Sequence, residues 1–163
     1  HALSRLAPVV SGSLFVATGA ERVALPGCSR AIVVADDPPG RGPLGGIAAA
    51  LWRSRTGVLA LACDLPLVTP ATLERVLRAG LAADRPAALR SRRGWEPLVA
   101  YYPRWVLPRV VAALDRKSIA PRVLLDRLGA VAVRPRSEDE VLNVNTPEDL
   151  ARALELAGGE ERR

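Results

Sequence analysis

The stretch AIVVADDPPGRGPLGGIAAALWRSRTGVLALACD, residues 31–64, decides the fold. It opens with the β-rich run AIVVAD at 31–36 and closes with VLALACD at 58–64. Neither run alternates apolar with polar residues, which is typical of strands buried on both faces of a parallel sheet. Between them, PPGRGPLGG predicts a loop and IAAALWRSR predicts a helix of about three turns. Strand, loop, helix and strand in this order make a βαβ unit.

Short runs elsewhere in the chain predict the remaining elements. Further strands are predicted at 13–18, 87–91, 96–102 and 130–134, and further helices in HALSRLAPVV, ATLERVLRAGLAA and DLARALELA and over 104–115 and 120–128. The turn RRGW between two of these strands favours an antiparallel excursion. Thr69 and Thr146, each followed by a proline, are predicted helix N-caps. The alternation predicts a single three-layer α/β/α nucleotide-binding (Rossmann-like) domain over residues 1–163, with a mostly parallel sheet.

The composition is that of a globular protein with an excess of positive charge. The formal net charge is +6, and Lys117 is the only lysine among 23 basic residues. The arginines are scattered between acidic residues, and aromatic residues make up only 4% of the chain, which argues against a nucleic-acid partner. The apolar run VLALAC at 58–63 is too short to cross a bilayer, so we expect no membrane association.

The two cysteines, Cys28 and Cys63, do not have the spacing of a metal site. Cys63 lies in a predicted strand, and we expect it to be a small buried hydrophobic residue. Such sparse use of cysteine favours a reducing cytoplasm, although the sequence leaves one disulfide open.

Asp64 directly follows an apolar run, and its position allows two interpretations. An aspartate at a strand end can bond the backbone two residues further on and simply form a turn. Alternatively, Asp64 and Asp36 both end strands at the carboxyl edge of the sheet, where α/β domains bind ligands. Carboxylates beside a helix N-terminus that can bind phosphate are what a Mg²⁺–nucleotide site requires. The second acid and the Gly/Pro loop after it favour this functional interpretation.

Two further motifs also allow a structural and a functional interpretation. The glycines of GRGPLGGI at 40–47 can simply permit a tight turn and close helix packing, and the motif is neither a GxGxxG nor a P-loop. In VLNVNTPEDL at 141–150, Asn145 can be a turn residue and Asn143 a satisfied polar group. In the functional interpretation, both amides lie on one side of an extended segment and bond a ligand with several polar groups.

Taken in order, several segments resemble the molybdenum cofactor guanylyltransferases across essentially the whole chain: DDPPGRGPLGGIAAAL, LACDLPLVTPATLERVL, EPLVAYYP, KSIAPRVLLDRLG and VLNVNTPEDL. GPLGGI and CDLP are shared with related cofactor nucleotidyltransferases, whereas EPL and NVNTPEDL narrow the match. That family normally opens with a strand and a loop of the LAGGxSxRMGxxK type, whose glycines and lysine hold the nucleotide phosphates. Neither is in this sequence, and His1 corresponds to the helix that follows, so we expect the first strand of the natural protein to be missing.

The resemblance implies transfer of GMP from Mg-GTP to the terminal phosphate of molybdopterin, with or without molybdenum, and release of pyrophosphate. It makes Asp64 the Mg²⁺ ligand. The residues that it places beside the nucleotide are Asp36, Gly42, Pro43, Leu44, Gly45 and Gly46. Those that it places on the pterin side are Glu96, Pro97, Lys117, Ser118, Arg122, Asn143 and Asn145. A cytoplasmic enzyme is implied, with molybdoenzymes or other cofactor-biosynthesis proteins as further partners.

Two other hypotheses stay open at this point. The first is a cytidylyltransferase or another nucleotidyltransferase of the same fold, because the choice of base depends partly on the loop that this sequence lacks. Comparing the turnover of GTP with that of CTP would separate it from a guanylyltransferase. The second is a nucleotide- or cofactor-binding module without catalysis.

Overall fold

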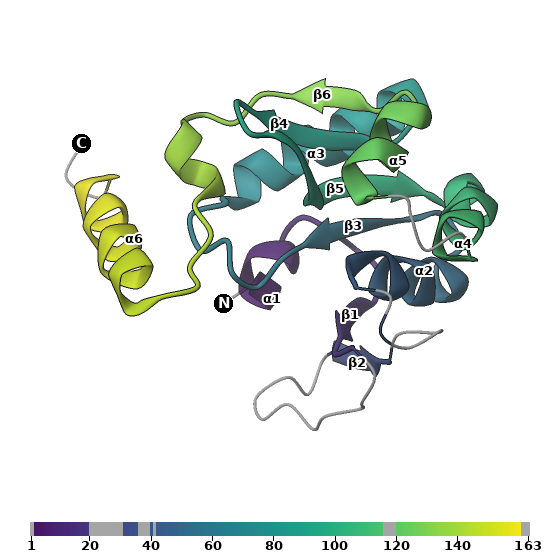
Figure 1. Cartoon of the computed structure of the whole chain (residues 1–163), viewed down its shortest axis with the longest axis horizontal. Helices are drawn as coiled ribbons and strands as arrows, with labels where there is room; N and C mark the ends of the chain where they lie inside the picture. Colours follow the sequence, from purple (N-terminus) through teal and green to yellow (C-terminus); the bar gives the residue numbers. More distant parts are fainter. Residues whose placement is uncertain (1, 20–30, 36–39, 41, 116–119, 161–163) are drawn as a thin grey trace.

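The computed structural model describes residues 2–19, 31–35, 40, 42–115 and 120–160 (Figure 1). The elements follow in the order α1 (Ala2–Leu6), β1 (Leu14–Ala17), β2 (Ala31–Val34), α2 (Pro43–Arg53), β3 (Gly57–Leu61), α3 (Pro70–Ala83), β4 (Ala87–Ser91), β5 (Gly94–Pro103), the 3₁₀ turn η1 (Arg104–Val106), α4 (Leu107–Asp115), α5 (Pro121–Arg127), β6 (Val131–Val133), the 3₁₀ turn η2 (Glu138–Val141) and α6 (Pro147–Glu160). The predicted alternation of strands and helices is confirmed, including the hairpin of β4 and β5 around the RRGW turn.

The larger sheet has four strands in the order β3-β5-β4-β6. β5 is antiparallel to both β3 and β4, whereas β4 and β6 are parallel. Three strands therefore run in one direction and β5 alone opposes them, so the sheet is mixed, with two antiparallel pairs and one parallel pair, and not mostly parallel in its pairing. β1 and β2 form a separate parallel pair. Among the described strands, β1 is hydrogen-bonded only to β2, and β3 only to β5.

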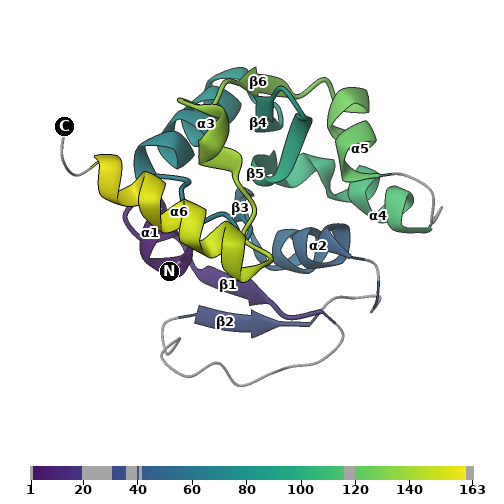
Figure 2. The same cartoon turned by 60° about the vertical axis from the view of Figure 1, so that its left-hand side comes forward.

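Helices cover both faces of the larger sheet, which gives the predicted three layers (Figures 1 and 2). On one face, side chains of α2, α4 and α5 pack with Ala100 and Tyr102 of β5. On the other face, α3 and Leu6 of α1 pack with Val99 and Tyr101 of the same strand. The alternation of inward and outward positions along β5 thus supplies both cores.

The prediction that the strands at 31–36 and 58–64 are buried on both faces is wrong, since only Val34 of β2 is buried and all five residues of β3 are half-buried. The side chain of Ile32 is 49% exposed, and β1 has three half-buried residues and one exposed residue. The pair of β1 and β2 packs against α2 but is not joined to the four-stranded sheet in the described part of the chain, so each strand lacks part of its cover.

Two glycines make room for the ring of Tyr101, which lies in the core between β5 and α3. A Cβ atom on Gly80 of α3 would lie 2.3 Å from Tyr101 Cδ1, and one on Gly57 of β3 would lie 2.7 Å from Tyr101 Oη. No real side chain tolerates such distances, so α3 can approach the sheet this closely only because these positions are glycine.

We expect Gly80→Ala to lower the free energy of unfolding by about 1–3 kcal/mol, because the added methyl overpacks the core against Tyr101. The better helix propensity of alanine, about 1 kcal/mol, works in the opposite direction and is outweighed. Urea denaturation measures the change. The matched control is Gly158→Ala in α6, where nothing lies within 4 Å of the new Cβ, and stability there should stay the same or rise. Equal effects of the two substitutions would contradict the packing argument.

Candidate functional site

Asp64 lies in the turn that follows β3, and not in the strand itself. β3 ends at Leu61, and Ala62 makes a last backbone bond, from its N to the carbonyl oxygen of Leu98 at 2.9 Å. The predicted strand of 58–64 is therefore too long, and Cys63 is exposed in the turn, so the prediction that it is buried is wrong. Cys28 lies outside the described residues. After Ala62 the chain turns at residues 63–64 and leaves the ladder.

Asp64 contacts a segment 79 residues further along the chain. Asn143 Nδ2 donates a hydrogen bond of 2.9 Å to Asp64 Oδ2. Val144 N donates to the backbone carbonyl oxygen of Asp64 at 2.8 Å. Asp64 is half-buried, and its other carboxylate oxygen, Oδ1, accepts no hydrogen bond from the part of the chain that the structure describes. One carboxylate oxygen is thus fixed by an amide and the other is available to a ligand.

The predicted GPLGG loop is mostly helix. Gly42 is the N-cap of α2, and Pro43 to Gly46 form its first turn, because proline at the first helical position has the right φ and needs no hydrogen-bond partner. Gly42 has φ 60° and ψ −153°, a conformation that is essentially restricted to glycine. Leu44 is buried in the core, so a ligand here would meet backbone N–H groups and not the leucine side chain.

The first turn of α2 lies at the same edge of the sheet as Asp64. α2 leads directly into β3 and packs against it, and in such a unit the helix runs opposite to the strand. The N-terminus of α2 therefore lies at the carboxyl end of β3. The free N–H groups of a helix N-terminus favour anions such as phosphate.

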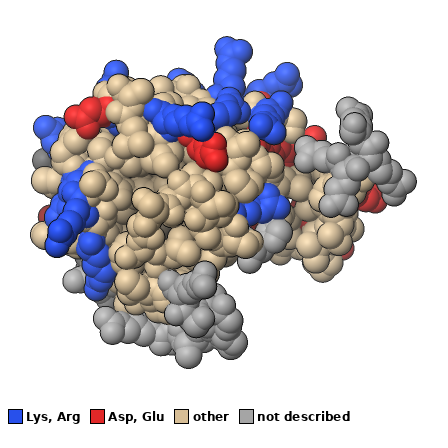
Figure 3. Space-filling model, turned by 180° about the vertical axis from the view of Figure 1, so that it is seen from behind, with Lys and Arg blue, Asp and Glu red and all other residues tan. Residues whose placement is uncertain are grey.

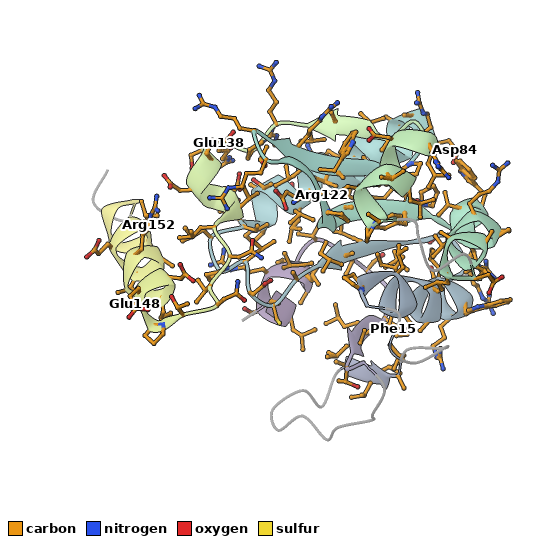
Figure 4. All side chains as sticks on the ribbon, viewed as in Figure 1. Phe15, Asp84, Arg122, Glu138, Glu148 and Arg152 are labelled. Carbon is orange, nitrogen blue, oxygen red and sulfur yellow. The ribbon has the colours of Figure 1, made fainter. Side chains whose placement is uncertain are left out.

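Glu96 and Arg122, both predicted on the pterin side, lie together. Arg122 Nη2 is 4.0 Å from Glu96 Oε2, and Arg122 Nη1 donates to the carbonyl oxygen of Arg93 at 3.2 Å. Ser91 Oγ donates to Glu96 Oε1 at 3.0 Å. Figure 4 labels Arg122 on α5, over the sheet. This polar group lies at the same edge as Asp64, since the bond from Ala62 to Leu98 sets the start of β5 beside the end of β3.

Of the other predicted site residues, two lie within the described residues and three lie outside them. Pro97 offers its carbonyl oxygen to the buried Tyr102 hydroxyl at 2.8 Å, so this oxygen already has one partner. Asn145 is exposed, and its side chain makes no hydrogen bond within the described ranges. The structure therefore brings Asn143, and not Asn145, into contact with Asp64. Three predicted site residues lie outside the described residues: Asp36, Lys117 and Ser118.

The sequence analysis missed Glu140, a buried carboxylate of η2, the turn that precedes Asn143. It is 5% exposed, accepts a hydrogen bond from the hydroxyl of Thr72, and accepts another from Arg136 N at 2.8 Å. In the sequence it is one of three acids in SEDEV, and nothing distinguishes it from its exposed neighbour Glu138. The available signal was the apolar pair Val141 and Leu142 next to it, which predicts that the chain enters the core here.

The described residues hold no group of three or more His, Cys, Asp or Glu side chains that could bind a metal ion by themselves. Within the described residues, a cation at Asp64 would have to complete its shell with oxygen atoms of a bound molecule or water. This fits Mg²⁺, which takes one or two carboxylates and completes its shell with phosphate oxygens and water. The geometry suits a ligand that brings both metal and phosphate.

The surface is rich in arginine. Arginine side chains gather along the upper edge of the face in Figure 3, over α3 and β6, and the formal net charge is +6. A net positive field of this kind raises the local concentration of anionic ligands. None of the helices in the described ranges is both long enough and apolar enough to span a membrane.

Comparison with known proteins identifies a family and several relatives. Residues 1–138 match the family of MobA-like NTP transferase domains. The molybdenum cofactor guanylyltransferase of Pseudomonas paraeruginosa is 41% identical over 118 residues, which is 71% of this chain and 60% of that protein. The chain thus spans about three fifths of the length of this relative.

Two solved structures are also similar to this chain. Molybdopterin-guanine dinucleotide biosynthesis protein A from Archaeoglobus fulgidus is 30% identical with a TM-score of 0.65, covering 78% of this chain and 68% of its own. The protein Rv0371c of Mycobacterium tuberculosis, solved in complex with manganese, is 25% identical with a TM-score of 0.59, covering 94% of this chain and 84% of its own. The fold class predicted from the sequence is confirmed by these likenesses.

The N-terminus of α6 is closed by a reciprocal pair of side chains directly after the Asn143 segment. Asp149 Oδ2 accepts hydrogen bonds from Asn145 N at 3.1 Å and Thr146 N at 3.0 Å, and Thr146 Oγ1 accepts one from Asp149 N at 3.1 Å. The predicted N-cap at Thr146 is thereby confirmed. The backbone N–H of Asn145, followed by the Thr146 side chain, lowers the pKa of Asp149 below its ordinary value of 3.8.

We expect the amide resonances of Asn145 and Thr146 to titrate together, with a midpoint below 3.8, the ordinary pKa of this carboxyl. A lowered pKa in the folded state means that the capping bonds are complete above that ordinary value and are lost as the pH falls through the lowered one. An NMR titration of the two amides measures the midpoint. Glu148→Gln, next to Asp149 in the chain, should leave it unchanged, whereas a midpoint at or above 3.8 would contradict the cap.

Proposed function

Because the chain belongs to the family of MobA-like NTP transferase domains, we propose that it transfers GMP from GTP to the phosphate of molybdopterin and releases pyrophosphate. The names of its relatives, a molybdenum cofactor guanylyltransferase and a molybdopterin-guanine dinucleotide biosynthesis protein, support this choice of substrates. The observation that carries the proposal is the 2.9 Å contact of Asn143 with Asp64. It joins the residue expected on the pterin side to the one expected at the nucleotide.

Asp64 suits the role of ligand to a divalent cation. Its Oδ2 is held by Asn143, and its Oδ1 is open to a ligand within the described part of the chain. A relative solved with manganese supports a divalent metal, and we propose Mg²⁺ as the ion that accompanies GTP. When bound there, Mg²⁺ would neutralise part of the negative charge of the triphosphate.

The chemistry needs little from the protein beyond placement and charge. An oxygen of the acceptor phosphate attacks the α-phosphorus of GTP, the bond from that phosphorus to the bridging oxygen of the β-phosphate breaks, and pyrophosphate leaves with its electron pair. A phosphate is already ionised near neutral pH, so no general base is required. The N–H groups of the first turn of α2 would receive the negative phosphates, and Asn143 would keep the Asp64 carboxylate in one orientation.

The positions of two further side chains support their assignment to the pterin side. Glu96 and Arg122 form a polar pair at the same edge as Asp64, suited to the polar groups of a pterin. Asn145 would contact the acceptor next to Asn143. Asp36, Pro97, Lys117 and Ser118 stay predictions, as do a cytoplasmic location and a partnership with molybdoenzymes or other cofactor-biosynthesis proteins.

We expect Asp64→Asn to reduce guanylyl transfer by about 100-fold or more, because it removes the charge that binds the cation. The free energy of unfolding should change by no more than about 0.5 kcal/mol, since asparagine still accepts the bond from Asn143. Transfer from GTP and from CTP is measured beside stability, and GTP should be the better donor.

Asp126→Asn is the matched control. Asp126 is an exposed carboxylate that accepts a bond of 2.6 Å from Trp95 Nε1, a role that asparagine can keep, so activity should stay near that of the wild type. Full activity per folded molecule in Asp64→Asn would make Asp64 a turn residue only. Turnover of CTP in preference to GTP would overturn the assigned base.

We expect Asn143→Ala and Asn145→Ala to raise the KM for molybdopterin more than the KM for GTP, by about tenfold for the loss of one good hydrogen bond. Asn143→Ala should in addition lower kcat, because only Asn143 touches the Asp64 carboxylate. Steady-state kinetics with each substrate varied in turn give both constants. Equal rises in the two KM values would remove both asparagines from the pterin side.

A further inference from the structure

Glu140 is the one acidic or basic side chain that is buried in the described part of the chain. It is 5% exposed and makes no ion pair with any described residue. A buried carboxylate without a cation is costly unless hydrogen bonds satisfy its oxygens. The residues that satisfy Glu140 therefore indicate what it does.

Hydrogen bonds link Glu140 to the start of α3. One oxygen accepts from the hydroxyl of Thr72, which is completely buried, and the other accepts from Arg136 N at 2.8 Å. The hydroxyl of Thr69, the N-cap of α3, donates in turn to Thr72 Oγ1 at 3.3 Å. Glu140 and Thr72 are 68 residues apart, so this link ties η2 to α3 through the interior.

Both ends of the link lead directly to the candidate site. On one side, the chain runs from Asp64 through a short turn into the N-cap Thr69. On the other side, η2 ends with a bond from Leu142 N to the carbonyl oxygen of Asp139 at 2.9 Å, and the next residue is Asn143. The bond between Glu140 and Thr72 thus joins the two chain segments that carry Asn143 and Asp64.

We propose that Glu140 is a positioning residue that acts through Thr72 to hold Asn143 on the Asp64 carboxylate. Its two oxygens match the two donors, the Thr72 hydroxyl and the Arg136 amide, which an apolar side chain of the same volume cannot do. The positional part of this proposal is independent of the reaction. Its consequence for turnover rests on the proposed function.

The proposal distinguishes substitutions that keep the tie from those that cut it. Glu140→Gln keeps an oxygen for Arg136 N and offers an N–H to Thr72 Oγ1, whose own hydroxyl can then donate to Thr69. Thr72→Ser also keeps the hydroxyl. Glu140→Ala and Thr72→Val cut the tie, and valine does so with almost no change of shape, so Thr72→Val leaves no cavity of the kind that Glu140→Ala creates.

The first readout is hydrogen exchange of the Val144 amide, which donates to the carbonyl oxygen of Asp64. Glu140→Ala and Thr72→Val should speed its exchange by about tenfold or more beyond any change in the slowest amides of β5, the measure of global unfolding. Glu140→Gln and Thr72→Ser should keep Val144 within about threefold of the wild type. Gly80→Ala, which destabilises the far end of α3, is the control and should not move Val144 more than β5.

The second readout is guanylyl transfer by the same proteins. Cutting the tie should lower kcat and raise the KM for molybdopterin, with little change in the KM for GTP, and the double variant Glu140→Ala/Thr72→Val should be no worse than the worse single variant. Glu140→Gln and Thr72→Ser should retain activity close to that of the wild type.

The two readouts separate failure of this proposal from failure of the proposed function. Unchanged Val144 exchange in Thr72→Val, or exchange in Glu140→Gln and Thr72→Ser as fast as in the variants that cut the tie, would overturn the positioning role. Val144 exchange that responds as expected in a protein without guanylyl transfer would support the positioning role and contradict the proposed function.

Discussion

The candidate site depends on the double contact of Asp64 with the segment of Asn143 and Val144. A backbone bond of 2.8 Å and a side-chain bond of 2.9 Å fasten the turn after β3 to a segment far along the chain. The backbone bond fixes the distance between the segments, and the side-chain bond fixes the rotation of the carboxyl group. Asp64 lies between the end of β3 and the start of α3, and Asn143 follows directly after η2, so these three elements position the two bonded segments. Placement of this kind is what phosphoryl transfer chiefly asks of a protein.

The electrostatics of the site follow from the Asp64 carboxylate, which Asn143 holds in place. Oδ1 of the half-buried Asp64 accepts no hydrogen bond from a described residue, and we expect this one oxygen to bind a bare divalent cation weakly, because the cation needs several oxygen ligands. Phosphate oxygens complete the shell, so metal and nucleotide are expected to bind together and not one before the other. The N-terminus of α2 and the arginine-rich surface (Figure 3) add to the attraction of an anionic ligand. α6, with Glu148 and Arg152 labelled in Figure 4, stands beyond this end of the sheet and is tied back by the ion pair of Arg152 with Asp139 at 3.1 Å.

Local sequence patterns predicted the helices and strands, whereas tertiary contacts determined the features that these patterns missed. The apolar runs and the caps at Thr69 and Thr146 were sufficient to predict the strands, the helices and the edge at which Asp64 lies. The end of β3 was misplaced because continued hydrophobicity did not reveal the turn that exposes Cys63. The first turn of α2 was read as a loop because glycines outweighed the proline in the sequence pattern. The hydrogen bond of Glu140 could not be predicted, because only the folded chain brings the Thr72 hydroxyl to it, although the apolar pair Val141 and Leu142 signalled that the chain is buried there.

The central claim is that the Asp64 carboxylate, held by Asn143, binds the cation of the nucleotide. The most direct measurement is the position of Mn²⁺, found by its anomalous scattering, in crystals of the protein grown with Mn²⁺ and GTP. We expect Mn²⁺ on an oxygen of Asp64 and on phosphate oxygens of GTP, with Asn143 Nδ2 still bonded to the other oxygen of Asp64. Mn²⁺ and GTP bound elsewhere, with Asp64 bonded only to Asn143, would contradict the account.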